Sequence, residues 1–153
     1  MTDTMMASIG AAVEQGRAGQ RAQARETLTT LWSATDDPLH RCSIAHYLAD
    51  LQDDPAAELL WDERALAAVT DLTDERAQRF HADLRVRGFL PSLRLNLADV
   101  HRRLGHPDEA RRQVAAAEEL LGDLPEGDYG AGIRAALAGV TALLAEGSTE
   151  RLT

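Results

Sequence analysis

Apolar residues recur at the spacing of a helix in the stretch from Pro91 to Leu121. In its first half they fall at i, i+4, i+7 and i+11, on one helical face, at Leu93, Leu97, Val100 and Leu104. Gly105 is typical of a residue that ends a helix, and Pro107 of one that begins the next. The second half repeats the spacing at Ala110, Val114, Ala117 and Leu121. The pattern therefore predicts two antiparallel helices joined by a tight turn.

The rest of the chain shows the same spacing, interrupted by runs of turn-forming residues. Gly19, the TDDP run at 35–38 and the QDDP run at 52–55 mark turns, and the TDDP run also caps the helix after it. Thr73, followed by two acids, predicts a further helix, which Gly88 ends. The loop GDLPEGDYGAG precedes the last helix. Beside the 91–121 pair, the predicted helices are 5–16, 21–34, 38–51, 55–72, 73–88 and 133–146.

No segment shows the alternation of apolar and polar residues that is typical of a strand. We therefore predict an all-α fold of about eight helices. No composition shift marks a domain boundary, so we expect a single domain over residues 1–153. Its tail, from about residue 147, is expected to be frayed.

Small residues lie where the two helices of the 91–121 pair approach each other. Counted about the turn at Gly105, they are Ala98, Ala110 and Ala117. With Pro125 near its end, this stretch resembles the tetratricopeptide repeat, a helix-turn-helix unit of about 34 residues, although His101 stands where the repeat prefers tyrosine. The whole chain is similar to the short tetratricopeptide-type proteins common in actinobacteria. The resemblance implies a right-handed array of antiparallel helix pairs that serves as an interaction scaffold.

The spacing of the turns makes this array irregular. Gly19 and Gln52 stand 33 positions apart, close to one repeat, whereas Gln52 and Gly105 stand 53 positions apart. The surplus over the period of about 34 residues amounts to one extra helix.

Composition narrows the classes of partner. Hydrophobic residues make up 44% of the chain but aromatic residues only 4%, so alanine and leucine must build the core, which suits closely packed helices.

A net charge of −9 argues against nucleic acid and against anionic membranes as partners. All basic residues are arginines, which together with the abundant alanine suggests a high-G+C genome.

Three features favour the cytoplasm. Cys42 is the single cysteine, so no intramolecular disulfide can form. The N-terminal stretch carries an acid and no basic residue before its short apolar run, unlike a signal peptide. No apolar run approaches the length of about 18 residues that a transmembrane helix needs.

In the resemblance, the first helix of each pair lines a concave face, and the polar residues there are the binding candidates. On the Pro91 helix these are Ser92, Asn96, Asp99 and Arg103. The same register gives Arg17 on the first helix, and on the third helix Ser43, His46 and Asp50. Asn96 stands where related proteins hold a peptide carboxylate, but the chain has no lysine, so such a site would rely on arginine. The alternative is an ordinary solvated helix face.

Two further groups of side chains are candidates for the same face. His81 stands close in sequence to Arg85 and Arg87, and a histidine with two arginines would suit an anionic ligand, the alternative being pairing with surface carboxylates. Tyr129 and Arg134 would close one end of the groove, or Tyr129 would simply anchor its loop on the last helix pair.

Signs of catalysis are missing from the sequence. It contains no nucleophile elbow, phosphate loop, dinucleotide fingerprint or metal signature. His40, Cys42 and His46 are close in sequence, but their spacing does not place all three on one helical face. We therefore expect no catalytic residue, no metal and no cofactor, with a distant pair such as His81 and Asp99 as the catalytic alternative.

Three functions remain open. The first is a non-catalytic interaction module that binds a protein or peptide partner through its polar concave face. The second is a small-molecule-binding protein or an unusual helical enzyme with a pocket near His81 and Asn96. The third is a self-associating regulatory subunit, such as a homodimer, with Trp32, Trp61 or Phe89 buried at a symmetric interface.

Overall fold

The computed structural model describes residues 3–80, 86–124 and 126–151, which are helical apart from short turns. Among these residues there are eight α-helices, one 3-10 turn and no strand, which confirms the predicted all-α class. The chain divides into two compact units, Met1–Arg85 and Val86–Thr153. The single domain over 1–153 stays a prediction. None of the helices in the described ranges combines the length and the apolarity that crossing a bilayer requires.

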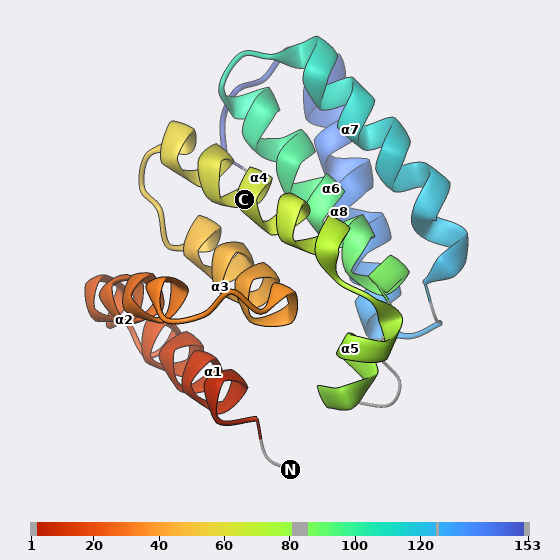
Figure 1. Cartoon of the computed structure of the whole chain (residues 1–153). Helices are drawn as coiled ribbons and strands as arrows, with labels where there is room; N and C mark the ends of the chain where they lie inside the picture. The colour runs from red at the N-terminus through yellow and green to blue at the C-terminus, as the bar shows by residue number, and fades with distance from the viewer. Residues whose placement is uncertain (1–2, 81–85, 125, 152–153) are drawn as a thin grey trace. The chain divides into compact units, whose positions relative to one another are not determined.

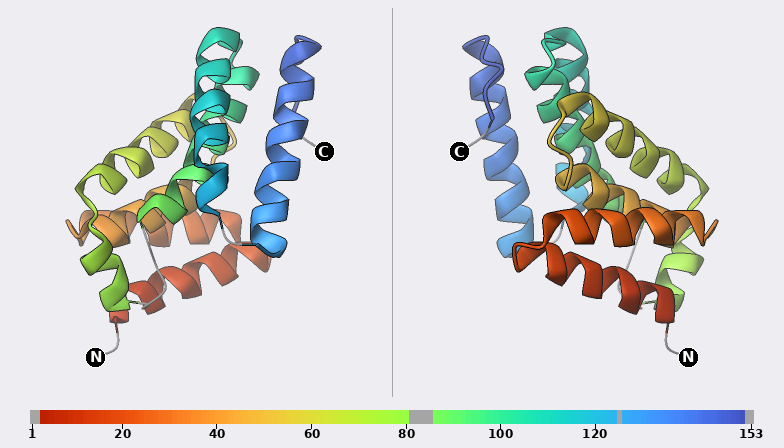
Figure 2. Two further views of the ribbon diagram at one scale, coloured as in Figure 1. Left: turned by 90° about the vertical axis from the view of Figure 1, so that its right-hand side faces the viewer. Right: turned by 90° about the vertical axis from the view of Figure 1, so that its left-hand side faces the viewer.

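Unit 1 contains the helices α1 (Thr4–Arg17), α2 (Arg21–Ser33), α3 (Pro38–Asp50), α4 (Pro55–Asp71) and α5 (Asp74–Phe80). From α1 to α4 each helix packs against the next, and α1 also contacts α3 (Figure 1). The side views show α1 and α2 lying along each other (Figure 2). These bounds agree closely with the four helices predicted between residues 5 and 72.

Aspartates begin three of these helices. Asp3, Asp37 and Asp54 each accept a hydrogen bond from a backbone N–H of the first turn, and a proline follows Asp37 and Asp54. The predicted caps in the TDDP run and at Thr73 are confirmed, since the Thr73 hydroxyl accepts from the Arg76 N–H at 3.1 Å. Gly19 makes the predicted turn with φ +94°, a conformation that favours glycine.

The core of unit 1 is built from small and aliphatic side chains of α1, α2 and α3. Ala12 and Ala24 are almost fully buried, which lets α1 and α2 approach closely. Around them lie Ile9, Leu28, Ile44, Leu48 and Leu51. Small and aliphatic side chains on closely packed helices thus fill a core that contains few aromatic residues.

A polar cluster, the Arg76 cluster, ties α5 to the starts of α1 and α3. Arg76 donates to the Asp37 carboxylate from Nε at 2.7 Å and to Asp3 from Nη2 at 3.3 Å. Nε2 of His40 lies 3.0 Å from the Asp3 carboxylate, and Nδ1 of His40 lies 3.0 Å from the Thr35 hydroxyl. The cap residues therefore also hold α5 in place.

Unit 2 contains α6 (Val86–Arg103), α7 (Pro107–Leu120), the 3-10 turn η1 (Leu121–Asp123) and α8 (Asp128–Ala145). Three predicted boundaries are wrong. Gly88 and Pro91 lie inside α6, because this glycine has a helical φ and a proline so near the described start of the helix removes few hydrogen bonds. The last helix begins at Asp128, not at Ile133, since Gly130 and Gly132 continue it despite their low helix propensity.

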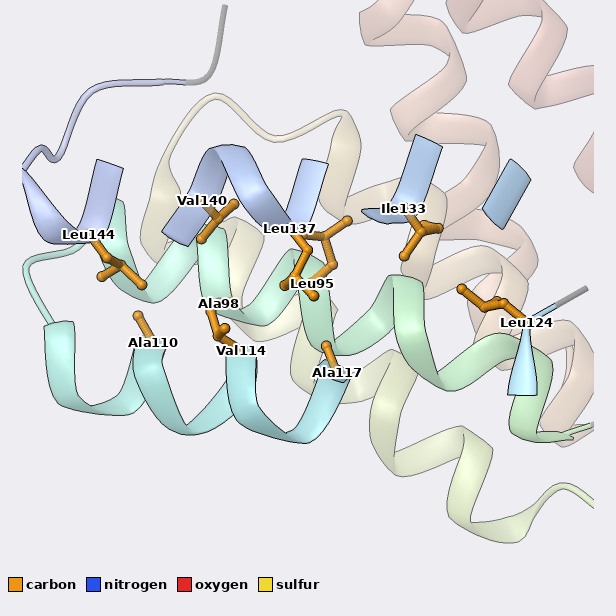
Figure 3. Close-up of a cluster of buried hydrophobic side chains, with 10 residues drawn as sticks. All are labelled: Leu95, Ala98, Ala110, Val114, Ala117, Leu124, Ile133, Leu137, Val140 and Leu144. Carbon is orange, nitrogen blue, oxygen red and sulfur yellow. The ribbon is translucent and has the colours of Figure 1, made fainter. Parts of the chain in front are cut away.

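The core of unit 2 joins all three of its α-helices (Figure 3). Leu95 and Ala98 of α6 face Ala110, Val114 and Ala117 of α7. The third side comes from Leu124 and from α8, through Ile133, Leu137, Val140 and Leu144. The three small residues that mark the repeat resemblance are fully buried, as a close helix contact requires.

A buried arginine secures the end of α8. Gly147, with φ +70°, lets the Ser148 N–H bond to the Leu143 carbonyl at 2.9 Å. Arg102, whose side chain is 1% exposed, donates to the Ser148 carbonyl at 2.9 Å and to Asp99 at 2.7 Å. The frayed tail predicted from about residue 147 stays a prediction, although its first two residues take part in this cap.

Candidate functional site

A pocket of about 240 Å³, the α1–α3 pocket, opens where α1, α2 and α3 of unit 1 meet. Its apolar lining comes from Val13, Leu28, Tyr47 and Leu51. Its charged lining comes from Arg17 at the end of α1, Arg21 at the start of α2 and Asp50 at the end of α3. An apolar surface with a few convergent charged groups is the usual composition of a binding site.

Gly16 lies in the wall of the pocket, close to side chains of α2 and of the end of α3. A Cβ atom at this position would lie 3.4 Å from the Ala24 Cβ and 3.4 Å from the Leu51 Cδ2. Alanine would just be accommodated at this position, whereas a larger side chain would have to displace these neighbours or enter the pocket.

The arginines of the pocket are held only loosely. Arg17 pairs with Glu14 at 2.7 Å, and Nη2 of Arg21 lies 3.7 Å from the Asp53 carboxylate. All four side chains are strongly exposed. Exposed pairs of this kind contribute about 0–1 kcal/mol, so both guanidinium groups can turn to a ligand at little cost.

Asp50 has an unusual electrostatic environment. The walls of the pocket desolvate its carboxyl group, although the residue remains exposed, and this burial raises the pKa above its usual value of 3.8. The positive charges of His46 and Arg21 act in the opposite direction without reversing the shift. Nη2 of Arg21 also donates a hydrogen bond to the backbone carbonyl oxygen of Asp50 at 3.4 Å.

Of the candidates predicted in unit 1, the structure brings Arg17 and Asp50 together in the pocket. His46 is half-buried beside it, with its ring centroid 5.4 Å from that of Tyr47. Ser43 is half-buried and does not line the pocket. His81 lies outside the described residues.

The predicted polar row of α6 is largely occupied by contacts within the helix. Asp99 accepts from Arg102 at 2.7 Å and from Arg103 at 2.9 Å. Ser92 donates to the Phe89 carbonyl at 3.2 Å, and Asn96 is half-buried. These four positions therefore do not present an open row of hydrogen-bonding groups.

The other candidates in unit 2 lie apart from this row. Arg87 is exposed on the first turn of α6. Tyr129 is 54% exposed on the first turn of α8. Arg134 donates to the Leu121 carbonyl at 3.0 Å and lines a shallow depression between α7 and α8.

Sequence reasoning missed Arg21 and Tyr47. The sequence does not single out Arg21, because this residue belongs to the second helix of its pair, which the repeat register assigns to the outer side. The signal that could have found it is the turn at Gly19, which brings Arg17 and Arg21 to the same end of the pair as the end of α3.

Within the described ranges, no three histidine, cysteine or acidic side chains are grouped as metal ligands. Cys42 is 3% exposed, and burial raises its pKa to about 12. At neutral pH this group is a thiol, which is a poor nucleophile and a poor metal ligand.

No family model, curated protein or solved structure matches the chain.

Proposed function

We propose that the chain is a non-catalytic helical interaction module that binds a peptide segment of a protein partner in the α1–α3 pocket. One observation carries this proposal. Arg17 and Asp50, which hold equivalent register positions on the first and third helices, line one pocket with apolar side chains between them. An extended peptide offers both the polar groups and the apolar side chains that such a lining can contact.

The contact pattern of the helices supports a tetratricopeptide-like array as the scaffold. From α1 to α4 and from α6 to α8 successive helices pack together, and the first helix also contacts the third: α1 contacts α3, and α6 contacts α8. Stacked helix pairs produce this pattern, because the first helices of neighbouring pairs lie side by side. The proposal includes the irregular right-handed arrangement and, on the support of the single buried cysteine, the cytoplasm as the location.

The test is selection of peptides from a displayed random library on the purified protein, followed by affinity measurement on variants. We expect the selected peptides to share a motif and to bind the double variant Arg17→Gln/Arg21→Gln about tenfold more weakly, a loss of about 1.4 kcal/mol. Both arginines are exposed, so the variant should keep its helix content, which circular dichroism checks.

Two controls locate the site. Arg111→Gln removes an exposed arginine of α7 that pairs with Asp108 at 3.1 Å, and it should leave the affinity unchanged. Peptides that lose affinity on Asn96→Ala but not on the arginine double variant would move the site to α6 and refute the pocket. Failure to select any common motif would refute the interaction module itself.

A further inference from the structure

Two tryptophans and two arginines form a stacked group on unit 1, outside the α1–α3 pocket. The rings of Trp32 in α2 and Trp61 in α4 meet edge to face, with centroids 5.1 Å apart and planes at 87°. The guanidinium carbon of Arg41 lies 4.4 Å from the centroid of Trp32, and that of Arg64 lies 4.4 Å from the centroid of Trp61. Each indole therefore carries a cation on its face.

Among the described residues, neither of these arginines forms an ion pair with a carboxylate. Among the described residues Arg64 makes no hydrogen bond or ion pair, and Arg41 donates only to the Thr35 carbonyl at 2.7 Å. Arginines elsewhere in the described ranges, such as Arg76 and Arg112, pair with acids. In a chain with 25 acidic and 16 basic residues, two arginines beside the same tryptophan that make no ion pair among the described residues keep their charge for an acidic ligand.

Stacking prepares these guanidinium groups for an anion. A guanidinium that lies over an indole keeps its N–H edge available, and a carboxylate can bind that edge with two parallel hydrogen bonds. Contact with the ring also restricts the side chain, so less conformational freedom is lost on binding.

An exposed apolar residue extends the same surface. Leu60 is 46% exposed and precedes Arg64 by four residues on α4, which places the two on one side of the helix. We define Trp32, Arg41, Leu60, Trp61 and Arg64 as the Trp–Arg surface. Tryptophan and arginine are the residue types that most often dominate the energy of protein interfaces.

We propose that the Trp–Arg surface is a second interaction site, which binds an acidic segment of a protein partner through carboxylates on Arg41 and Arg64 and an apolar side chain on Leu60. Charge complementarity selects this occupant. A second copy of the chain in a symmetric dimer about this surface would bring arginine against arginine. A nucleic acid would be repelled by the net charge of −9.

The surface carries its own reporter, because Trp32 and Trp61 are the two tryptophans of the chain and both belong to it. The experiment titrates the full chain with a short synthetic peptide of glutamate and leucine in helical register while tryptophan emission is recorded. We expect a saturable change in emission that weakens as salt is added. The matched peptide with glutamine in place of glutamate should produce no such change.

Variants decide whether the arginines carry the binding. Arg64→Gln should weaken binding about tenfold or more, because a charge-assisted hydrogen bond is lost. Arg64→Lys should give an intermediate loss, because lysine keeps the charge but not the paired donors. Arg64 has no hydrogen bond to lose within the described residues, so these variants should fold, and thermal unfolding checks this.

Three outcomes would overturn the proposal. These are equal binding by wild type and Arg64→Gln, equal response to the glutamine peptide, and an emission change that depends on protein concentration alone, which would indicate self-association. Arg111→Gln, which removes an exposed arginine outside both sites, should bind the acidic peptide like the wild type. Neither tryptophan lines the α1–α3 pocket, so the emission change reports the Trp–Arg surface, and its failure is distinguishable from failure of the pocket.

Discussion

Aspartates at helix starts have two roles in this chain: some only cap the helix, and others also bind an arginine. Asp54 accepts from the Ala56 N–H at 3.1 Å and is exposed, so it acts as a simple cap. Asp37 caps α3 through Oδ1 and also accepts from Arg76 through Oδ2 at 2.7 Å. Both precede a proline, so they form a matched pair for measuring what the second contact adds.

We expect Asp54→Ala to lower the free energy of unfolding by about 1 kcal/mol, the usual value of a cap. Asp37→Ala should lower it by about 2 kcal/mol, because the pair with the largely buried Arg76 is lost as well. Urea unfolding followed by circular dichroism measures both. Equal losses for the two variants would show that Arg76 contributes nothing through Asp37.

Burial of Cys42 predicts an inert thiol. Its side chain is 3% exposed and its pKa is raised to about 12 by burial. A reagent therefore cannot reach the sulfur atom, and the thiol is not ionised at neutral pH. We expect an aqueous thiol reagent to label the native protein only as fast as the surrounding structure opens, and at once in concentrated urea. Rapid labelling without denaturant would show that α3 is not packed as described.

Two glycines of α6 and of the turn after it differ in backbone conformation. Gly88 lies inside α6 with a helical φ, and nothing lies within 4 Å of an added Cβ. Gly105 ends the turn before α7 with φ +79°, where a side chain is strained although space is available. The same substitution should therefore have opposite effects at the two positions.

We expect Gly88→Ala to raise the free energy of unfolding by about 0.5–1 kcal/mol, because alanine has the higher helix propensity. Gly105→Ala should lower it by about 1–2 kcal/mol, because alanine resists the left-handed conformation. Thermal unfolding of both variants provides the comparison. A loss of stability in Gly88→Ala would contradict the continuous helix through this position.

For the whole molecule, we expect the stability in acid to depend on the Arg76 cluster. Burial acts to raise the pKa of Asp3, but hydrogen bonds from His40, from the Met6 N–H and from Arg76 lower it below 3.8. For Asp37, burial likewise acts upward and the hydrogen bond from Arg76 downward, with the pKa again below 3.8. A carboxyl group whose pKa is lower in the folded than in the unfolded state stabilises the fold. The stabilisation is complete at a pH above the unfolded-state pKa, and it is lost as the pH falls through the folded-state pKa.

We therefore expect the free energy of unfolding to fall as pH drops below about 3.8. Asp37→Asn keeps a side-chain oxygen for the cap but cannot titrate, so its stability should decline less steeply with acid. Urea unfolding across this pH range tests the slope. Parallel curves for wild type and Asp37→Asn would assign the acid sensitivity to other carboxyl groups, since Glu109 also has a lowered pKa, from hydrogen bonds with Arg112 and Gln113.

The sequence by itself determined the helices, because their signals are local. Apolar spacing, aspartate caps and the glycines at 19 and 105 act within a few residues, and the helix bounds from Thr4 to Asp71 follow from them. Locally weak residues were misread at Gly88, Pro91 and Gly130, because packing of α6 and α8 outweighs their low propensity.

Only the tertiary structure decided which side chains meet. The α1–α3 pocket joins Arg21 to Asp50, and the Trp–Arg surface joins Trp32 to Trp61, residues that lie 29 positions apart in each case. Helix register places a residue on a face, but the packing of one helix on another sets the partner across the contact. The same reason explains why Asp99, which the register assigns to the polar side of α6, pairs with Arg102 and Arg103 rather than being open to a ligand.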